Sequence, residues 1–365
     1  MTRPLNIYAG PTALKRLRQD GFHPALFDYF LGASGGPKWF VLAGLDRVLF
    51  PEFFHDTDRQ VNIVGSSAGA FRAACMTQNN PLKAINRLAE SYSQTVYSDK
   101  PTSGEITSKA VELLHYMLDG KGAGQILSNP RFKAHLITAR CHGIVGRPGK
   151  WSQLSGLALS AAGNMLNRRN LQRRFTRVIF STPNSHLDII DPYRLKTEQA
   201  TLSQDNIADV LLASGSIPLV LDGVSDIEGA APGVYRDGGI VDYHFDLAFE
   251  NQQGLTLYPH FYPRPVTGWF DKKLKNRHVH ARSYDNVVML VPSSEFVETL
   301  PYKKIPDRTD FEVMTPDIRL PYWKTVLNET DRLGEYFMNK VTDGTIMDEI
   351  QPLPFPCLPN KRCLT

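Results

Sequence analysis

The stretch VNIVGSSAGAFRAACM, residues 61–76, decides the fold that we expect for this chain. Four residues typical of a buried strand lead into a G-x-S-x-G frame, and a helix of small residues follows it. A nucleophilic serine on a sharp strand-to-helix turn needs small residues two positions before and after it, because side chains there would collide. The stretch therefore predicts a nucleophile elbow with Ser67 at its tip.

A second frame of this kind, GASGG at residues 32–36, follows the apolar stretch 27–31. Pro37 comes next and suits the first turn of a helix, but it has no N–H to donate. Consecutive glycines at a helix N-terminus expose backbone N–H groups, which favour an anion. We therefore interpret this frame as an anion cradle and take Ser67, rather than Ser34, as the nucleophile.

Lys38 falls in the first turn of the helix that follows this cradle. A cation there opposes the helix dipole unless an anion lies nearby, and a substrate head group is one candidate. The alternative is a solvated lysine with a small penalty. A Walker phosphate loop does not fit, because Trp39 stands where that motif needs serine or threonine.

A serine hydroxyl is a weak nucleophile until a neighbouring group takes its proton. Asp237 is one candidate base, because the two glycines after it permit a tight turn close to another backbone. The same Asp-Gly pair is also a strong signal for an ordinary hairpin turn. Histidine is the usual base, but no neighbourhood singles out one of the late histidines, which are His244, His260, His278 and His280.

Alternating strand and helix patterns predict an α/β fold with a largely parallel sheet. Residues 101–170 are mostly helical in pattern, with a strand near 135–139. Further strands are expected at 177–181, 255–261 and 287–291, and one helix is expected over 322–340. The proline-rich tail at 351–359 is expected to be extended.

The composition is that of an ordinary globular protein, with 365 residues, 42% of them hydrophobic and 21% charged. A net charge of +4 is mild and does not indicate nucleic acid. No apolar run is long enough for a membrane span, and residues 1–6 lack the apolar stretch of a signal peptide. No C-x-x-C spacing occurs, so we expect a cytoplasmic protein without a metal site or cofactor; the cysteines are Cys75, Cys141, Cys357 and Cys363.

Taken together, these motifs resemble those of the patatin-like phospholipase family. The run SGGPK at 34–38 is similar to the family's oxyanion loop, Ser67 matches its elbow serine, and Asp237-Gly238-Gly239 matches its dyad motif. The run ASGSIP at 213–218 is similar to the helix end before the dyad strand. Order and spacing agree across roughly residues 27–250. Three departures are Ser34 in place of glycine, Trp39 in place of glycine, and Asp242-Tyr243 in place of the commoner asparagine.

The resemblance implies a three-layer α/β/α fold with a catalytic domain over 21–250, a helical insertion at about 101–170 and a C-terminal extension over 251–365. It implies a Ser–Asp dyad without histidine, in which Ser67 attacks an ester carbonyl and Asp237 takes the proton. The N–H groups of Gly35 and Gly36 would hold the oxyanion, and Lys38 would contact a head group.

The implied activity is metal-independent hydrolysis of phospholipid or lysophospholipid esters. Two alternatives remain open. One is an α/β-hydrolase esterase with a Ser-His-Asp triad, and the other is a lipid-binding protein that keeps the fold without turnover.

Apolar residues at helical spacing precede a group of arginines in the middle of the chain. The apolar residues are Leu154, Leu157, Ala158, Ala161, Ala162 and Met165, and the arginines are Arg168, Arg169, Arg173, Arg174 and Arg177. One interpretation is a stripe that lies peripherally on an anionic bilayer. The other is a core-facing helix whose C-terminal cations complement its dipole.

Overall fold

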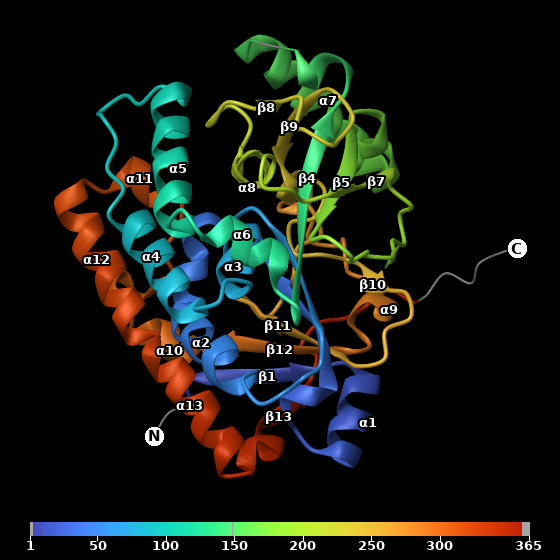
Figure 1. Ribbon diagram of the computed structural model, residues 1–365, viewed down its shortest axis with the longest axis vertical. Helices are drawn as coiled ribbons and strands as arrows, with labels where there is room; N and C mark the ends of the chain where they lie inside the picture. The colour runs from blue at the N-terminus through green and yellow to red at the C-terminus, as the bar shows by residue number, and fades with distance from the viewer. Residues whose placement is uncertain (1–2, 148, 360–365) are drawn as a thin grey trace, which may run out of the picture.

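The computed structural model describes residues 3–147 and 149–359, and one large mixed sheet runs through them (Figure 1). Its path is β13-β1-β12-β11-β2-β3-β4-β5-β7, with β9 paired to β4 and β8 paired to β9; β6 and β10 form a separate pair. The strands are β1 (Leu5–Ala9), β2 (Phe27–Gly32), β3 (Val61–Ser66), β4 (Phe132–Cys141), β5 (Phe175–Ser181), β6 (Ile189–Ile190), β7 (Thr197–Thr201), β8 (Val224–Ser225), β9 (Val234–Asp237), β10 (Ala248–Phe249), β11 (Leu255–Pro259), β12 (Val287–Pro292) and β13 (Ile350–Pro352).

The middle of the sheet is parallel. Strands β12, β11, β2, β3 and β4 each run parallel to the next, whereas β1, β5 and β9 pair antiparallel with their neighbours β12 and β4. The central strands are almost continuously buried, as expected for a sheet covered on both faces. The predicted α/β fold with a mostly parallel sheet is confirmed.

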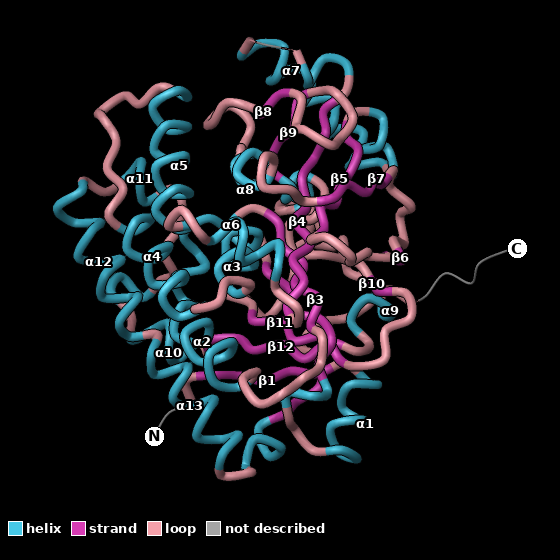
Figure 2. Tube along the Cα trace, in the orientation of Figure 1, coloured by secondary structure: helices cyan, strands magenta, loops and turns pink. Residues whose placement is uncertain are grey.

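Helices flank this sheet, and Figure 2 shows the strands as a continuous band with most helices gathered on one side. On that side lie α2 to α5 and α10 to α13, while α1 and α9 lie on the other (Figure 1). The helices are α1 (Pro11–Asp20), α2 (Ala43–Val48), α3 (Ala68–Met76), α4 (Pro81–Ser93), α5 (Ser103–Leu118), α6 (Gly122–Ser128), α7 (Lys150–Leu166), α8 (Ile207–Gly215), α9 (Ala281–Tyr284), α10 (Ser294–Thr299), α11 (Asp310–Val313), α12 (Pro316–Glu329) and α13 (Asp331–Thr342).

The prediction of a single helix over 322–340 is wrong, because the chain divides into α12 and α13 at Thr330. The Thr330 hydroxyl accepts a hydrogen bond from the Gly44 N–H at 3.1 Å and donates to the Leu327 carbonyl at 2.9 Å. A Cβ on Gly44 would lie only 1.9 Å from the Thr330 carbonyl oxygen. The break is therefore fixed by a close approach to α2 that local sequence does not reveal.

The segments outside the central motifs also build the sheet. Residues 101–170 supply α5, α6 and α7, but they also contain β4, which lies between β3 and β5. Residues 251–359 supply β11, β12 and β13, and β11 pairs directly with β2. The division into a catalytic domain over 21–250 and an extension over 251–365 stays a prediction.

Candidate active site

Ser67 lies on the sharp turn between β3 and α3, with a φ of 55° and a ψ of −128°. This backbone conformation is uncommon for a residue with a side chain and is typical of strained functional positions. A Cβ on Gly65 would lie 2.3 Å from the Gly69 carbonyl oxygen, and one on Gly69 would lie 1.8 Å from the Gly32 carbonyl oxygen. The steric reason expected for the small residues of the elbow is confirmed.

Asp237 ends β9 and faces this serine, although the two residues are 170 positions apart. The Ser67 hydroxyl donates to Asp237 Oδ2 at 2.8 Å, and the Gly239 N–H donates to Asp237 Oδ1 at 2.7 Å. Both side chains are buried. One carboxylate oxygen is therefore held by the backbone while the other accepts the hydrogen bond from the serine hydroxyl.

Burial raises the pKa of Asp237 to about 6. The hydrogen bonds from Ser67 and Gly239 lower this pKa, and the charges of Lys272 and Arg308 lower it further, but burial outweighs them. A carboxylate with a pKa close to neutrality suits proton transfer at physiological pH.

Two further serines complete the turn, and the sequence analysis did not single them out. The Ser67 N–H donates to the Ser214 hydroxyl at 2.9 Å, and this hydroxyl donates to the Ile137 carbonyl at 2.8 Å. The Ser66 hydroxyl donates to the Asp242 carbonyl at 2.6 Å. Ser214 lies in the ASGSIP run at the end of α8, so its position was noted but its contact with Ser67 was not.

The glycine loop at residues 32–36 lies beside the elbow. Gly36 has a φ of 54° and lines the same cavity as Ser67. In the described part of the chain, neither the N–H of Gly35 nor that of Gly36 has a hydrogen-bond acceptor. The Ser34 side chain points elsewhere, with its Oγ 2.5 Å from Ser66 Oγ. Within the described residues, the loop thus leaves two backbone donors without acceptors, and Gly36 shares a cavity with Ser67.

Lys38 has an anionic partner within the protein, since its ammonium forms an ion pair with Asp307. Burial, with smaller contributions from the nearby charges of Lys272 and Arg308, lowers the pKa of Lys38 to about 8. Asp307 therefore supplies the anion that a cation in this first helical turn needs.

A cavity of about 650 Å³ opens over Ser67. Its walls are largely apolar and come from α3, α4, α5, α8 and α11, with Phe71, Leu113, Val220 and Phe311 among the lining residues. Arg308 also lines it, and Lys272 Nζ lies 4.2 Å from the centre of the nearby Tyr243 ring. Neither cation forms an ion pair within the described residues. The cavity combines an apolar interior, a buried nucleophile and positive charge near the base.

A family model described as patatin-like phospholipase matches residues 56–244, just over half of the chain. The chain belongs to the patatin-like phospholipase family. The matched region contains both Ser67 and Asp237 but begins after the glycine loop. The resemblance inferred from the motifs is confirmed, and with it the patatin-like three-layer α/β/α fold.

Among solved structures, the chain is similar to VipD from Legionella pneumophila, with 13% sequence identity and a TM-score of 0.32. The similarity covers 64% of this chain and 50% of the VipD chain, so this chain spans about half the length of that relative. No curated protein matches this chain.

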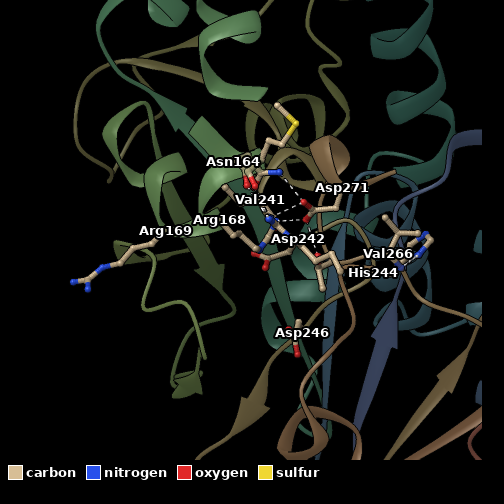
Figure 3. A network of polar contacts seen from close by, with 12 residues as sticks. Asn164, Arg168, Arg169, Val241, Asp242, His244, Asp246, Val266 and Asp271 are labelled. Atoms are coloured by element: carbon tan, nitrogen blue, oxygen red, sulfur yellow. Dashed lines mark hydrogen bonds and ion pairs between the residues drawn. The ribbon is translucent and has the colours of Figure 1, made fainter. Parts of the chain in front are cut away.

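The late histidines of this patatin-like protein all have partners other than the dyad. His244 accepts from the Val266 N–H at 2.8 Å through Nδ1 (Figure 3). His260 contacts the backbone of Tyr262, His280 pairs with Asp246 at 2.8 Å, and His278 lies 3.2 Å from Arg264. Within the described residues, none hydrogen-bonds Ser67 or Asp237.

A buried polar network supports the turn that carries Asp237 (Figure 3). Arg168 donates to the Val241 carbonyl and to Asp271, the latter at 2.8 Å. The guanidinium of Arg177 binds both carboxylate oxygens of Asp242, at 2.5 and 2.9 Å. The Asp242 side chain, one of the departures from the family pattern, therefore faces Arg177. The network fixes residues 241 and 242 just beyond the dyad motif.

Within the described residues, no group of three or more His, Cys, Asp or Glu side chains has the arrangement of a metal site. Of the helices in residues 3–147 and 149–359, none has the length and apolarity to cross a bilayer. Cys75 and Cys141 are buried free thiols, and Cys357 is half-buried; Cys363 lies outside the described residues.

Proposed function

We propose that this protein is a lipid acyl hydrolase that cleaves the carboxylic esters of phospholipids or lysophospholipids through a Ser67–Asp237 dyad. The observation that carries the proposal is the 2.8 Å hydrogen bond from Ser67 to Asp237 in a largely apolar cavity. A buried nucleophile, a base with a raised pKa and room for an acyl chain are what such a reaction requires.

The reaction begins when Ser67 Oγ attacks the ester carbonyl carbon and Asp237 Oδ2 takes the hydroxyl proton. The N–H groups of Gly35 and Gly36 bind the negative oxygen of the tetrahedral intermediate. Collapse of the intermediate breaks the ester bond, and the leaving alcohol takes the proton from Asp237. Water then attacks the carbonyl of the acyl-enzyme, and Asp237 takes a proton from this water. When the fatty acid leaves, Asp237 returns the proton to Ser67 Oγ.

The positive groups near Asp237 favour an anionic or phosphate-bearing head group. Arg308 lines the cavity and Lys272 lies close enough for its charge to lower the pKa of Asp237. Lys38 adds to the positive potential, but its ion pair with Asp307 leaves Arg308 and Lys272 as the proposed head-group contacts.

A fluorophosphonate probe tests the nucleophile. It should label the wild type and Ser34→Ala but not Ser67→Ala, because the Ser67 hydroxyl is hydrogen-bonded to a buried carboxylate, whereas the Ser34 hydroxyl contacts Ser66. Release of fatty acid from phospholipids by the wild type, and none by Ser67→Ala, would then establish hydrolysis. A folded wild type that neither reacts with the probe nor turns over any ester would favour the non-catalytic lipid-binding alternative.

A further inference from the structure

Much of the apolar stripe of α7 faces outward. The helix packs against the rest of the protein through Gly156, Ser160 and Asn164, which are buried, and through Leu157, which is half-buried against the core. A Cβ on Gly156 would lie 2.4 Å from Val145 Cγ1, so this contact is close. The core-facing interpretation therefore applies to Leu157 but not to Ala158, Ala161, Ala162 and Met165, which are exposed.

Large apolar side chains occupy the exposed face instead. Trp151 is 82% exposed and Leu166 is 85% exposed, while Met165 and Leu159 are 62% and 52% exposed. Alanines 158, 161 and 162 on the same helix are also exposed. We call this face the α7 surface, defined by Trp151, Ala158, Leu159, Ala162, Met165 and Leu166. An exposed apolar face of this extent marks an interaction surface.

The segment of the chain that contains this surface carries charge of one sign. From Gly120 to Leu187 the sequence holds no aspartate or glutamate, and it holds eleven lysines and arginines. Five of these cations lie at the ends of α7 and form no ion pair within the described residues, namely Arg147 before the helix, Lys150 at its first position, and Arg169, Arg173 and Arg174 after it. Figure 3 shows Arg168 pointing into the buried network and Arg169 pointing away from it.

We propose that the α7 surface docks this protein on an anionic lipid bilayer. A helix that lies in the membrane interface needs an apolar face, an interfacial aromatic residue and cations that reach the head groups, and α7 has all three. A bilayer is favoured over a second copy of the chain, because two copies would bring the unpaired cations of both α7 surfaces together.

The position of α7 relates this surface to the candidate active site. The helix stands at the end of the molecule opposite α13 and β13 (Figure 1). Its C-terminal end is tied to the dyad turn, since Asn164 donates to Asp271 at 2.7 Å and Arg168 donates to both Asp271 and the Val241 carbonyl. A docked α7 would therefore hold the catalytic turn in a fixed position relative to the lipid surface.

Trp151 is a built-in probe of this docking. Trp39 and Trp323 are fully buried and Trp269 is half-buried, so Trp151 alone among the four tryptophans is strongly exposed. The full-length Ser67→Ala variant should show a blue shift of tryptophan emission with vesicles of phosphatidylcholine and phosphatidylglycerol. Phosphatidylcholine vesicles alone should produce little shift. In a Trp151→Phe variant the shift should vanish while co-sedimentation with the mixed vesicles persists.

Paired variants separate the apolar from the electrostatic contribution. The change Trp151→Ser with Leu166→Ser should weaken co-sedimentation with the mixed vesicles by about tenfold or more. The change Arg169→Glu with Arg173→Glu should weaken it about twentyfold or more, because each basic residue near an anionic surface contributes roughly fivefold. Ile318→Ser on α12, where Ile318 is 45% exposed, is the matched control and should bind as the parent does.

Circular dichroism should show that each variant is folded. Vesicle binding that neither paired variant reduces would overturn the proposal, as would equal binding to neutral vesicles. A dimer in light scattering that dissociates in Trp151→Ser with Leu166→Ser would assign the surface to a second copy instead. Because binding is measured without turnover, these outcomes are independent of whether the proposed hydrolysis is correct.

Discussion

In the proposed reaction Asp237 must be charged to act as a base, yet its buried position disfavours the charge. Its pKa of about 6 lies about two units above that of an exposed aspartate, and each unit corresponds to about 1.4 kcal/mol. Because the folded-state pKa is raised, the folded state binds the proton more tightly than the unfolded state does. The associated stability is fully present below about pH 4 and is lost as the pH rises through 6.

We therefore expect Asp237→Asn to lose activity and gain stability. Turnover of a soluble ester should fall at least about 10²-fold, since no other acceptor among the described residues hydrogen-bonds Ser67 Oγ. The melting temperature of Asp237→Asn relative to the wild type should rise between pH 5 and pH 8 by the equivalent of about 1.4 kcal/mol, because the remainder of the two-unit shift is lost below pH 5. The wild-type rate should be half-maximal near pH 6. An unchanged difference in melting temperature across this range would contradict the raised pKa.

The glycine loop offers a second test at the residue scale. Gly36→Ala places a side chain at a φ of 54°, with its Cβ 3.4 Å from the Tyr92 hydroxyl. If the Gly36 N–H binds the oxyanion, a displaced donor should lower kcat by roughly 10²–10³. The matched control is Gly120→Ala, because Gly120 has a φ of 65° and no atom within 4 Å of the added Cβ.

Both alanine variants should lose a similar stability of about 1–2 kcal/mol from left-handed strain, measured by urea unfolding. Only Gly36→Ala should lose turnover. Equal turnover in the two variants would reduce the loop to a packing turn.

Single residues were predictable where a motif carries its own geometry. Ser67 stands in a frame whose glycines are needed for close backbone approach, and Asp237 precedes two glycines for a related reason. Ser214, Arg308 and Asp307 were not predictable in their roles. Each reaches its place near the elbow only through the tertiary fold, and no local spacing distinguishes it from other serines, arginines and aspartates.

At the scale of elements, one buried ion pair connects the two helices that follow the catalytic loops. Arg72 on α3 donates to both carboxylate oxygens of Asp46 on α2, at 2.8 and 2.6 Å. Both side chains are completely buried. The pair therefore fixes the helix behind the elbow against the helix behind the glycine loop.

We expect Asp46→Ala to cost about 3–5 kcal/mol in the free energy of unfolding, because it leaves the Arg72 charge buried without a partner. Urea unfolding monitored by circular dichroism measures the change. The double variant Asp46→Leu with Arg72→Met should recover most of the loss, since an apolar pair of similar volume needs no charge compensation. An Asp46→Ala variant as stable as the wild type would contradict this expectation, because the Arg72 charge would then have to be solvated by water.

Helices and strands were predictable from local sequence patterns wherever one face of the element, or the whole element, is buried. Strands β2, β3, β5, β11 and β12 were expected close to their observed bounds because their apolar runs are continuous. The helix expected from Pro37 instead begins as a 3-10 helix over Gly36–Leu42 before α2. The division of α12 from α13 was missed because it depends on a contact with Gly44.

At the scale of the whole molecule, residues beyond 250 complete the sheet. β11 pairs with β2, the strand that leads into the glycine loop, with Thr256 opposite Tyr29 and Leu257 opposite Phe30. The ring of Phe261 lies against Gly35, because a Cβ on Gly35 would come within 2.7 Å of it. The sequence motifs end near residue 250, so they did not reveal that the glycine loop rests on the later part of the chain.

This arrangement predicts that a chain ending at residue 250 will not fold as an independent unit. Its loss of β11 would expose the edge of β2, an aggregation-prone surface, and its loss of α12 would expose Phe40, which packs against Trp323 with ring centres 5.2 Å apart. We expect it to lack a cooperative thermal transition and to resist fluorophosphonate labelling.

The matched control is the same chain divided between Asn251 and Gln252, with both pieces co-expressed. This division falls in an exposed turn before β11, so the pieces should associate, co-purify and label at Ser67. If residues 1–250 alone unfolded cooperatively and reacted with the probe, β11 to β13 would be an accessory layer on a complete domain. In that case the predicted boundary near residue 250 would be a true domain boundary, and Phe261 would be dispensable to the glycine loop.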